Sequence, residues 1–112
     1  MTVWVVQNVH WVDRVDGQLK PKFDFAKAER FGRVEYLLEP GASPFSLAGP
    51  LKTLQEKLQD YDARTDFLLL VGSPVLIGLA VAIACGPDNA VNMLQWSGAK
   101  RDYIPCMASG IF

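Results

Sequence analysis

Cysteine, histidine and clustered positive charge are scarce in this sequence, and each shortage narrows the range of functions. The two cysteines, Cys85 and Cys106, have a spacing that suits neither a disulfide framework nor a CxxC redox motif. The single histidine, His10, lies in no cluster of metal-ligating residues, so the sequence predicts no metal site and no cofactor. The densest basic run is Lys100-Arg101, and Asp102 follows it at once. Such a thin basic stretch argues against a nucleic-acid partner.

Membrane-spanning and targeting segments are also missing from the expected organisation. The uncharged run from Phe67 to Cys85 has about the length of a bilayer-spanning helix. However, Gly72-Ser73-Pro74 interrupts the run, and Asp66 and Asp88 close it without basic anchors, which argues against membrane insertion. The first residues carry neither a basic flank nor a small-residue cleavage site, so we expect a cytoplasmic protein.

The composition is that of a globular chain. Apolar residues make up 50% of the 112 residues and charged residues 21%, which is too apolar for a disordered protein. The formal net charge is −1, so no strong field of either sign favours a particular partner. We expect one domain with one core, over residues 1–112.

The stretch at 66–87 organises the rest of the chain. The apolar run at 68–71 predicts a buried strand, and Gly72 ends it. Ser73 is expected to cap a helix through its hydroxyl group, and Pro74 suits the first helical position. The sequence therefore predicts a helix over 74–85, which Gly86-Pro87 ends. This helix has no polar face.

Further elements flank this unit on both sides. The spacing of Leu51, Leu54 and Leu58 predicts an amphipathic helix over 50–61, with Pro50 in its first turn. Asp24 can cap a single helical turn that Gly32 ends. The β-branched and aromatic patterns predict strands at 2–7, 33–39, 91–96 and 101–107, the last one at a sheet edge because it contains Pro105.

These elements predict an α/β fold with a small mixed sheet of four to five strands and two main helices. A β-α-β-α-β core would pair the strands at 33–39, 66–71 and 91–96 in parallel through right-handed crossovers. A C-terminal antiparallel hairpin would complete the sheet. The two crossovers run in one direction, so both helices are expected on the same face of the sheet.

Three stretches carry a resemblance to a known family. They read FDFAKAERFGRVEYLLEPGASPF, DFLLLVGSPVLIGLAVAIA and VNMLQWSGAKRDYIP, and they cover most of the chain between about residues 22 and 105. The pattern resembles a family of small uncharacterised proteins encoded by phages and prophages. The resemblance implies a viral origin and a compact α/β fold, and it implies no activity, substrate or catalytic residue.

The candidate site comes from an arrangement that occurs twice in the sequence. A strand is followed by a turn, which reads Gly-Ala-Ser-Pro the first time and Gly-Ser-Pro the second, and the turn leads into a helix. If the two strands are neighbours, Ser43, Gly72 and Ser73 lie together at the carboxyl edge of the sheet, where open α/β sheets bind ligands. The amino end of the second helix would then offer N–H groups to a phosphate or a carboxylate. The alternative is that these residues only turn the chain and start the helix. No nucleotide fingerprint favours the first reading.

His10 and the aromatic residues are two further candidates for function. His10 would need a nucleophile such as Ser43, Ser73 or Cys106 within hydrogen-bond distance before it could act as a base, so a structural role is favoured. The aromatic residues could form a platform for bases, but no basic residues are interleaved with them in the sequence, and core packing or a protein interface is the better reading. The aromatic residues are Trp4, Trp11, Trp96, Tyr36, Tyr61 and Tyr103.

The sequence favours a small phage protein that is not an enzyme and that binds a host or viral protein or assembles with itself. The alternative is an anion-binding, nucleotide-binding or enzymatic domain that uses the crevice at the carboxyl ends of the strands. We expect a homo-oligomer, because the apolar helix at 74–85 and one sheet face would otherwise stay open to water. The interface between copies would be this helix or the uncovered sheet face. The protein is expected to act in the cytoplasm of the host.

Overall fold

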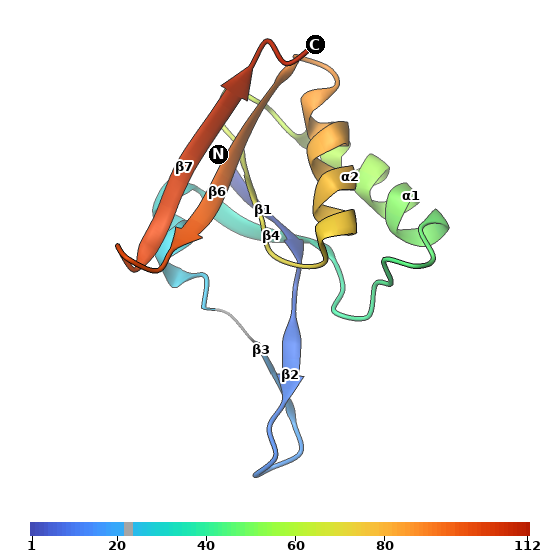
Figure 1. Cartoon of the computed structure of the whole chain (residues 1–112), viewed down its shortest axis with the longest axis vertical. Helices are drawn as coiled ribbons and strands as arrows, with labels where there is room; N and C mark the ends of the chain where they lie inside the picture. The colour runs from blue at the N-terminus through green and yellow to red at the C-terminus, as the bar shows by residue number, and fades with distance from the viewer. Residues whose placement is uncertain (22–23) are drawn as a thin grey trace.

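A five-stranded mixed sheet forms the body of the protein, as expected (Figure 1). The computed structural model describes residues 1–21 and 24–112. The strand order is β4-β1-β5-β6-β7, with parallel pairing throughout except between β6 and β7, which form the predicted antiparallel hairpin. The strands are β1 (Thr2–Gln7), β4 (Arg33–Leu38), β5 (Phe67–Leu69), β6 (Ala90–Ser97) and β7 (Asp102–Ser109).

The central position of β1 corrects one prediction. We expected β4 and β5 to pair directly, but β1 lies between them, and Val5 is in register with Tyr36 on one side and Leu69 on the other. The physical reason is burial, because Val3, Val5 and Val6 of β1 are 0% exposed and fill both faces of the sheet. A strand that is apolar on both faces is most stable in the middle of a covered sheet.

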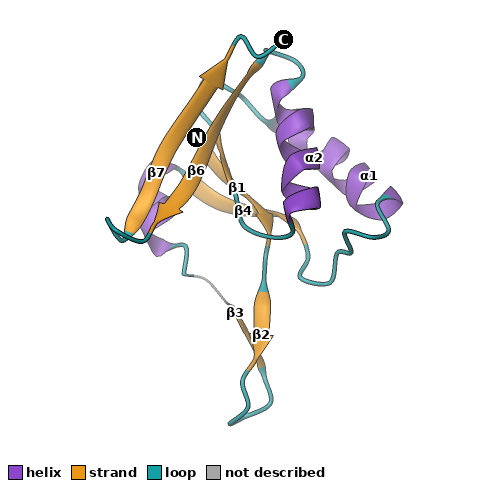
Figure 2. Ribbon diagram, in the orientation of Figure 1, coloured by secondary structure: helices purple, strands orange, loops and turns teal. Residues whose placement is uncertain are grey.

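The two main helices cover one face of this sheet (Figures 1 and 2). They are α1 (Ala48–Lys57), which a 3₁₀ turn, η2 (Leu58–Asp60), continues, and α2 (Pro74–Cys85). Leu54 and Leu58 point into the core, as their spacing predicts, and they share one cluster with Leu76 and Ala80 of α2. Both helices lie on the same face, as predicted.

The opposite face is covered by a 3₁₀ helix, η1 (Ala26–Phe31), which is cyan in Figure 1. Its Ala28 packs against Val3, Val5, Leu69 and Leu94 of the sheet, all at most 1% exposed. The Asp24 carboxylate accepts the amide of Ala26 at 2.9 Å, and the helix ends at Gly32 as expected. This part of the N-terminal third therefore covers a sheet face that the sequence left open.

A second, two-stranded sheet projects from the body beyond the end of β1 (Figure 1). It consists of β2 (His10–Val12) and β3 (Leu19–Pro21), which are antiparallel. The turn between them is closed by its own hydrogen bonds, from the Asp13 amide to the Gln18 carbonyl and from the Gly17 amide to the Asp13 carbonyl. The hairpin thus extends the carboxyl edge of the main sheet outward.

A buried carboxylate holds the opposite, amino edge of the sheet. Asp66 is 4% exposed and accepts hydrogen bonds from the Thr2 amide, the Trp4 indole and the Asp62 amide. These bonds fix the start of β1 to the loop before β5, because a buried carboxylate must be satisfied by donors. No helix within residues 1–21 and 24–112 is both long and apolar enough to cross a bilayer.

Candidate functional site

The carboxyl edge of the sheet, where we expected a ligand crevice, is bridged by the side chain of Gln7. Gln7 is the last residue of β1 and is only 6% exposed. Its Nε2 donates to the carbonyls of Glu39, Pro40 and Ala42 at 3.0 to 3.3 Å, and its Oε1 accepts the Ser73 amide at 3.2 Å. One buried amide therefore joins the loop after β4 to the loop after β5.

Gly72 lies directly against this bridge. Its φ is +126°, and a Cβ built there would lie 2.6 Å from the Gln7 Cβ. Only glycine fits a position that combines a positive φ with so close an approach. The loop after β5 is thus shaped by Gln7, a residue that sequence reasoning had missed. The signal for it was a polar side chain at the carboxyl end of an otherwise apolar strand.

Ser73 begins α2 as predicted, but not by the predicted bond. It is the N-cap residue with extended φ and ψ, Pro74 follows in the first turn, and the Ser73 side chain makes no capping hydrogen bond. Its backbone amide is already paired with Gln7. The prediction that the hydroxyl caps the helix is therefore wrong, and Gln7 holds the start of α2 through the Ser73 backbone amide instead.

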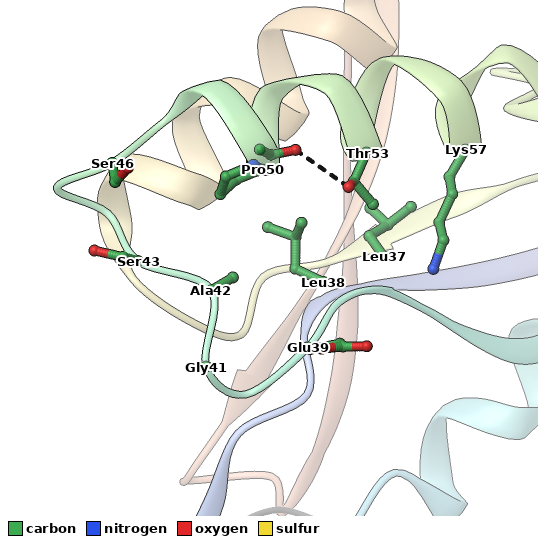
Figure 3. A pocket seen from close by; sticks show the side chains of 11 residues that line it. Leu37, Leu38, Glu39, Gly41, Ala42, Ser43, Ser46, Pro50, Thr53 and Lys57 are labelled. Atoms are coloured by element: carbon green, nitrogen blue, oxygen red, sulfur yellow. Dashed lines mark hydrogen bonds between the residues drawn. The ribbon is translucent and has the colours of Figure 1, made fainter.

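Ser43 belongs to a separate hollow of about 620 Å³ between α1 and the loop after β4 (Figure 3). Leu37 and Leu38 lie between the helix and the loop, and Lys57 reaches down to donate to the Tyr36 carbonyl at 3.0 Å. The Ser43 hydroxyl accepts the Phe45 amide at 3.1 Å, and in Figure 3 it points away from Leu38 and Lys57. The Ser43 hydroxyl thus serves a local turn.

Gly72 lines a different hollow, on the η1 side of the sheet, of about 530 Å³. Its walls are the end of β5, Trp96 and Tyr103, with Asp24 at one side. The structure thus brings Ser43, Gly72 and Ser73 to one edge of the sheet, but it places Ser43 and Gly72 in two separate hollows. β1 and Gln7 lie between them, because β4 and β5 are not neighbours.

Trp96 is the exposed aromatic residue of this second hollow. It is 47% exposed, and its ring lies edge-on to the Tyr103 ring at 5.0 Å between centroids. The Tyr103 hydroxyl donates to the Asp24 carbonyl at 3.2 Å. Burial, and then the charge of Asp24, raise the pKa of Tyr103 above its ordinary value, so this hydroxyl stays protonated and keeps its bond.

A basic cluster adjoins Trp96 in the fold, although no basic residues are interleaved with the aromatic ones in the sequence. Lys27 and Arg30 of η1 meet Lys100 and Arg101 of the β6–β7 turn around a shallow hollow of about 380 Å³. The Lys27 ammonium lies 5.8 Å from the centre of the Trp96 ring and donates to the Arg101 carbonyl at 2.6 Å. These cations are far apart in the sequence, so no linear motif could reveal them.

Arg30 is the one member of the basic cluster with a carboxylate partner among the described residues. Its guanidinium lies 2.7 Å from Asp102 and also donates to the Tyr103 carbonyl. Burial alone would raise the pKa of Asp102, but hydrogen bonds from the Tyr103 amide and from Arg30 outweigh it and lower the pKa below its ordinary value. The pair neutralises one charge, which leaves Lys27, Lys100 and Arg101 in excess.

His10 and its candidate partners Ser43, Ser73 and Cys106 are not joined by hydrogen bonds in the described part of the structure. Within the described ranges, His10 Nδ1 is buried without a hydrogen-bond partner. Cys85 is buried and Cys106 exposed, both as free thiols. The side chain of Trp11 lies outside the described part of the structure.

Comparison with known proteins places the chain in a family. A family model for phage Pam3 gp32-like proteins matches residues 1–109. The chain belongs to this phage protein family. The resemblance to phage proteins drawn from the three sequence stretches is thereby confirmed, over a longer range than those stretches cover. No curated protein and no solved structure matches the chain significantly.

Proposed function

We propose that this phage protein has a non-enzymatic role, exerted through protein–protein contact, and that the outer face of α2 carries the contact. The observation behind the proposal is that the exposed residues of this helix are all apolar or lack a side chain: Pro74, Val75, Gly78 and Ala82. Val75 is 48% exposed. Free thiols at Cys85 and Cys106 suit the reducing cytoplasm of an infected host cell, where we propose that the protein acts.

The neighbouring helix supplies an internal comparison. On α1 the water-facing residues include Lys52, Gln55 and Glu56, which is the usual pattern for a helix that packs by one face. On α2 the inner face is buried through Leu76 and Ala80, yet the outer face has no polar side chain to hydrate. Burying that face would stabilise a complex by about 25 cal/mol for each Å² of apolar surface removed from water. This gain in free energy favours a protein partner that packs on the outer face of α2.

A second copy of the chain is the occupant we propose. An exposed helix face meets its own copy readily across a two-fold axis, since each copy offers the same surface. Gly78 and Ala82 lie one turn apart and allow two helix backbones to approach closely. The other interface that the sequence allowed, an uncovered sheet face, loses its support, because η1 covers Val3, Val5, Leu69 and Leu94.

Light scattering on the purified protein tests the proposal. We expect a mass of twice the 12.4 kDa of the chain at micromolar concentration. Gly78→Glu should halve that mass, because it places a carboxylate on the outer face of α2. A Cβ at Gly78 meets no atom within 4 Å, so the variant should fold, and the melting temperature checks this.

Gly49→Glu is the matched control. Gly49 is also an exposed helical glycine with open space around its Cβ, but it lies on α1. The control should keep the mass of the parent protein. A monomeric parent would contradict self-association. The same pair of variants would then be used in a pull-down from infected cells. A partner that is lost with Gly78→Glu but kept with Gly49→Glu would show that α2 contacts a different protein.

A further inference from the structure

We propose that the two hollows that adjoin where Lys27 meets Trp96 bind a nucleotide, with the base against Trp96 in the apolar hollow and the phosphate on Lys27, Lys100 and Arg101. This site lies on the η1 side of the sheet, and the proposal does not depend on self-association through α2. It also differs from the predicted crevice, because Ser43 and Ser73 take no part in it. Gly72 is the one predicted residue that lines it.

The apolar hollow has the size and the walls for a planar base. Its volume of about 530 Å³ lies within the ordinary range of small-molecule pockets. Leu69, Val71 and Tyr103 form its walls, and Trp96 offers a half-exposed indole on which a base can stack. Asp24, at the side of the hollow, can accept a hydrogen bond from a base amino group. The hollow lies at the carboxyl end of β5, the edge at which open α/β sheets bind ligands.

The basic hollow beside it has uncompensated charge. Arg30 is paired with Asp102, whereas the Lys100 and Arg101 side chains make no hydrogen bond or ion pair with any described residue. The formal net charge of the whole chain is −1, so this local excess of cations is not part of a generally basic surface. A phosphate placed there would gain charge-assisted hydrogen bonds from the Lys100 and Arg101 side chains.

Lys27 connects the two hollows. It lines the basic one, while its ammonium lies over the ring of Trp96, which lines the apolar one. An acidic peptide would use only the basic hollow, and an acyl chain would use only the apolar one. A nucleotide has a planar aromatic part and an anionic part a few bonds apart, so it is the ligand class that uses both.

Direct titration of the full-length protein tests this proposal. The probes are adenosine monophosphate, adenosine and inorganic phosphate, followed by calorimetry, and a labelled oligothymidylate, followed by fluorescence anisotropy. We expect the monophosphate or the oligonucleotide to bind more tightly than adenosine or phosphate alone. Tighter binding of the oligonucleotide assigns the nucleotide to a single strand, and tighter binding of the monophosphate assigns it to a free nucleotide. Raising the salt concentration should weaken whichever complex forms.

Three variants test the two halves of the site separately. Trp96→Ala should weaken binding about tenfold or more, and Trp96→Phe should restore most of it, because base stacking needs a ring. Lys100→Ala with Arg101→Gly should weaken binding about tenfold and flatten its salt dependence. Arg101 has φ +50°, a conformation that glycine adopts freely, so this change should not harm the fold.

Lys52→Ala is the matched control, because it removes an exposed lysine from α1, outside both hollows. It should bind like the parent protein. Circular dichroism of each variant shows whether the fold is kept. The proposal is overturned if neither the monophosphate nor the oligonucleotide binds, if phosphate alone binds as tightly as either, or if the folded Trp96→Ala variant binds like the parent.

Discussion

Gln7 shows how one side chain can set the shape of a sheet edge. Its amide group bonds to three carbonyls of one loop and to the amide of Ser73, just before α2. Buried polar groups that lose their partners cost about 1 to 3 kcal/mol each unless water replaces them. The loops after β4 and β5 should therefore depend on Gln7 more than on the serines that the sequence singled out.

Replacing Gln7 should destabilise the protein more than replacing Ser73. We expect Gln7→Ala to lower the free energy of unfolding by about 2 kcal/mol or more, because the carbonyls of the loop after β4 and the Ser73 amide lose a buried partner. Ser73→Ala should change it by less than about 0.5 kcal/mol, since its hydroxyl makes no capping bond. Urea unfolding measures both. Equal losses would mean that the hydroxyl caps the helix in solution.

Gln7→Glu makes the same comparison at nearly constant volume. It replaces the donating Nε2 by an oxygen that faces the carbonyls of Glu39, Pro40 and Ala42. At neutral pH the variant should therefore be less stable than the parent. Acidification should recover part of the loss, because a protonated carboxyl can again donate one hydrogen bond.

Asp102 and Arg30 give a prediction of pH dependence. The pKa of Asp102 is lowered in the folded protein, so its pair with Arg30 contributes stability that is fully present above the unfolded pKa of about 4 and is lost as pH falls through the folded pKa. Arg30→Ala should raise the pKa of Asp102 toward the ordinary value. An NMR titration of the side-chain carboxyl measures this shift. Arg33→Ala, which removes the partner of Glu35, should leave the pKa of Asp102 unchanged.

At the scale of elements, the hairpin of β2 and β3 stands apart from the body. Its strands pair with each other, and its turn is closed by the Asp13–Gln18 and Gly17–Asp13 backbone bonds. We expect replacement of residues 10–20 by a short Asn-Gly turn to change the melting temperature by only a few degrees. Circular dichroism follows the transition. A large drop in melting temperature would show that the hairpin packs on the body and contributes to its stability.

The sequence predicted individual elements better than their lateral order. Local signals, such as Pro74 at the start of α2, fix where a helix begins, and the bounds at 74–85 are confirmed. The predicted helix at 50–61 ends as a regular α-helix at Lys57 and continues as η2. No local signal states which strand lies beside which. The position of β1 beside β4 depends on the chain that links these two strands. That chain runs through the β2–β3 hairpin and η1, and η1 lies on the face of the sheet opposite α1 and α2.

The candidate sites follow the same division. The turns at Ser43 and at Gly72-Ser73 were visible in the sequence because glycine, serine and proline mark turns, and both lie at the predicted edge. The basic cluster was not visible, because Lys27 and Lys100 meet only after η1 packs beside the β6–β7 turn. Spatial clusters of this kind need the tertiary fold before they can be recognised.

At the scale of the whole molecule, β1 is the element on which both layers depend. It pairs with β4 and β5, it contributes Val6 to the core under α1 and α2, and it contributes Val3 and Val5 to the core under η1. Opening β1 would therefore expose both cores at once, so its amides should exchange only when the whole protein unfolds. Among the described strands, the outer strand β7 pairs only with β6, so it should open locally.

Hydrogen exchange measured residue by residue tests this hierarchy. We expect the amides of Val5 and Val6 to be the slowest, with an opening free energy equal to that of global unfolding, and amides in β7 near the exposed Met107 to exchange faster. Repeating the exchange measurement at lower protein concentration tests self-association. If α2 joins two copies, amides of α2 should exchange faster as concentration falls, while β7 stays unchanged. Protection of β7 equal to that of β1 would contradict the hierarchy and would place the contact between copies at the β7 edge instead.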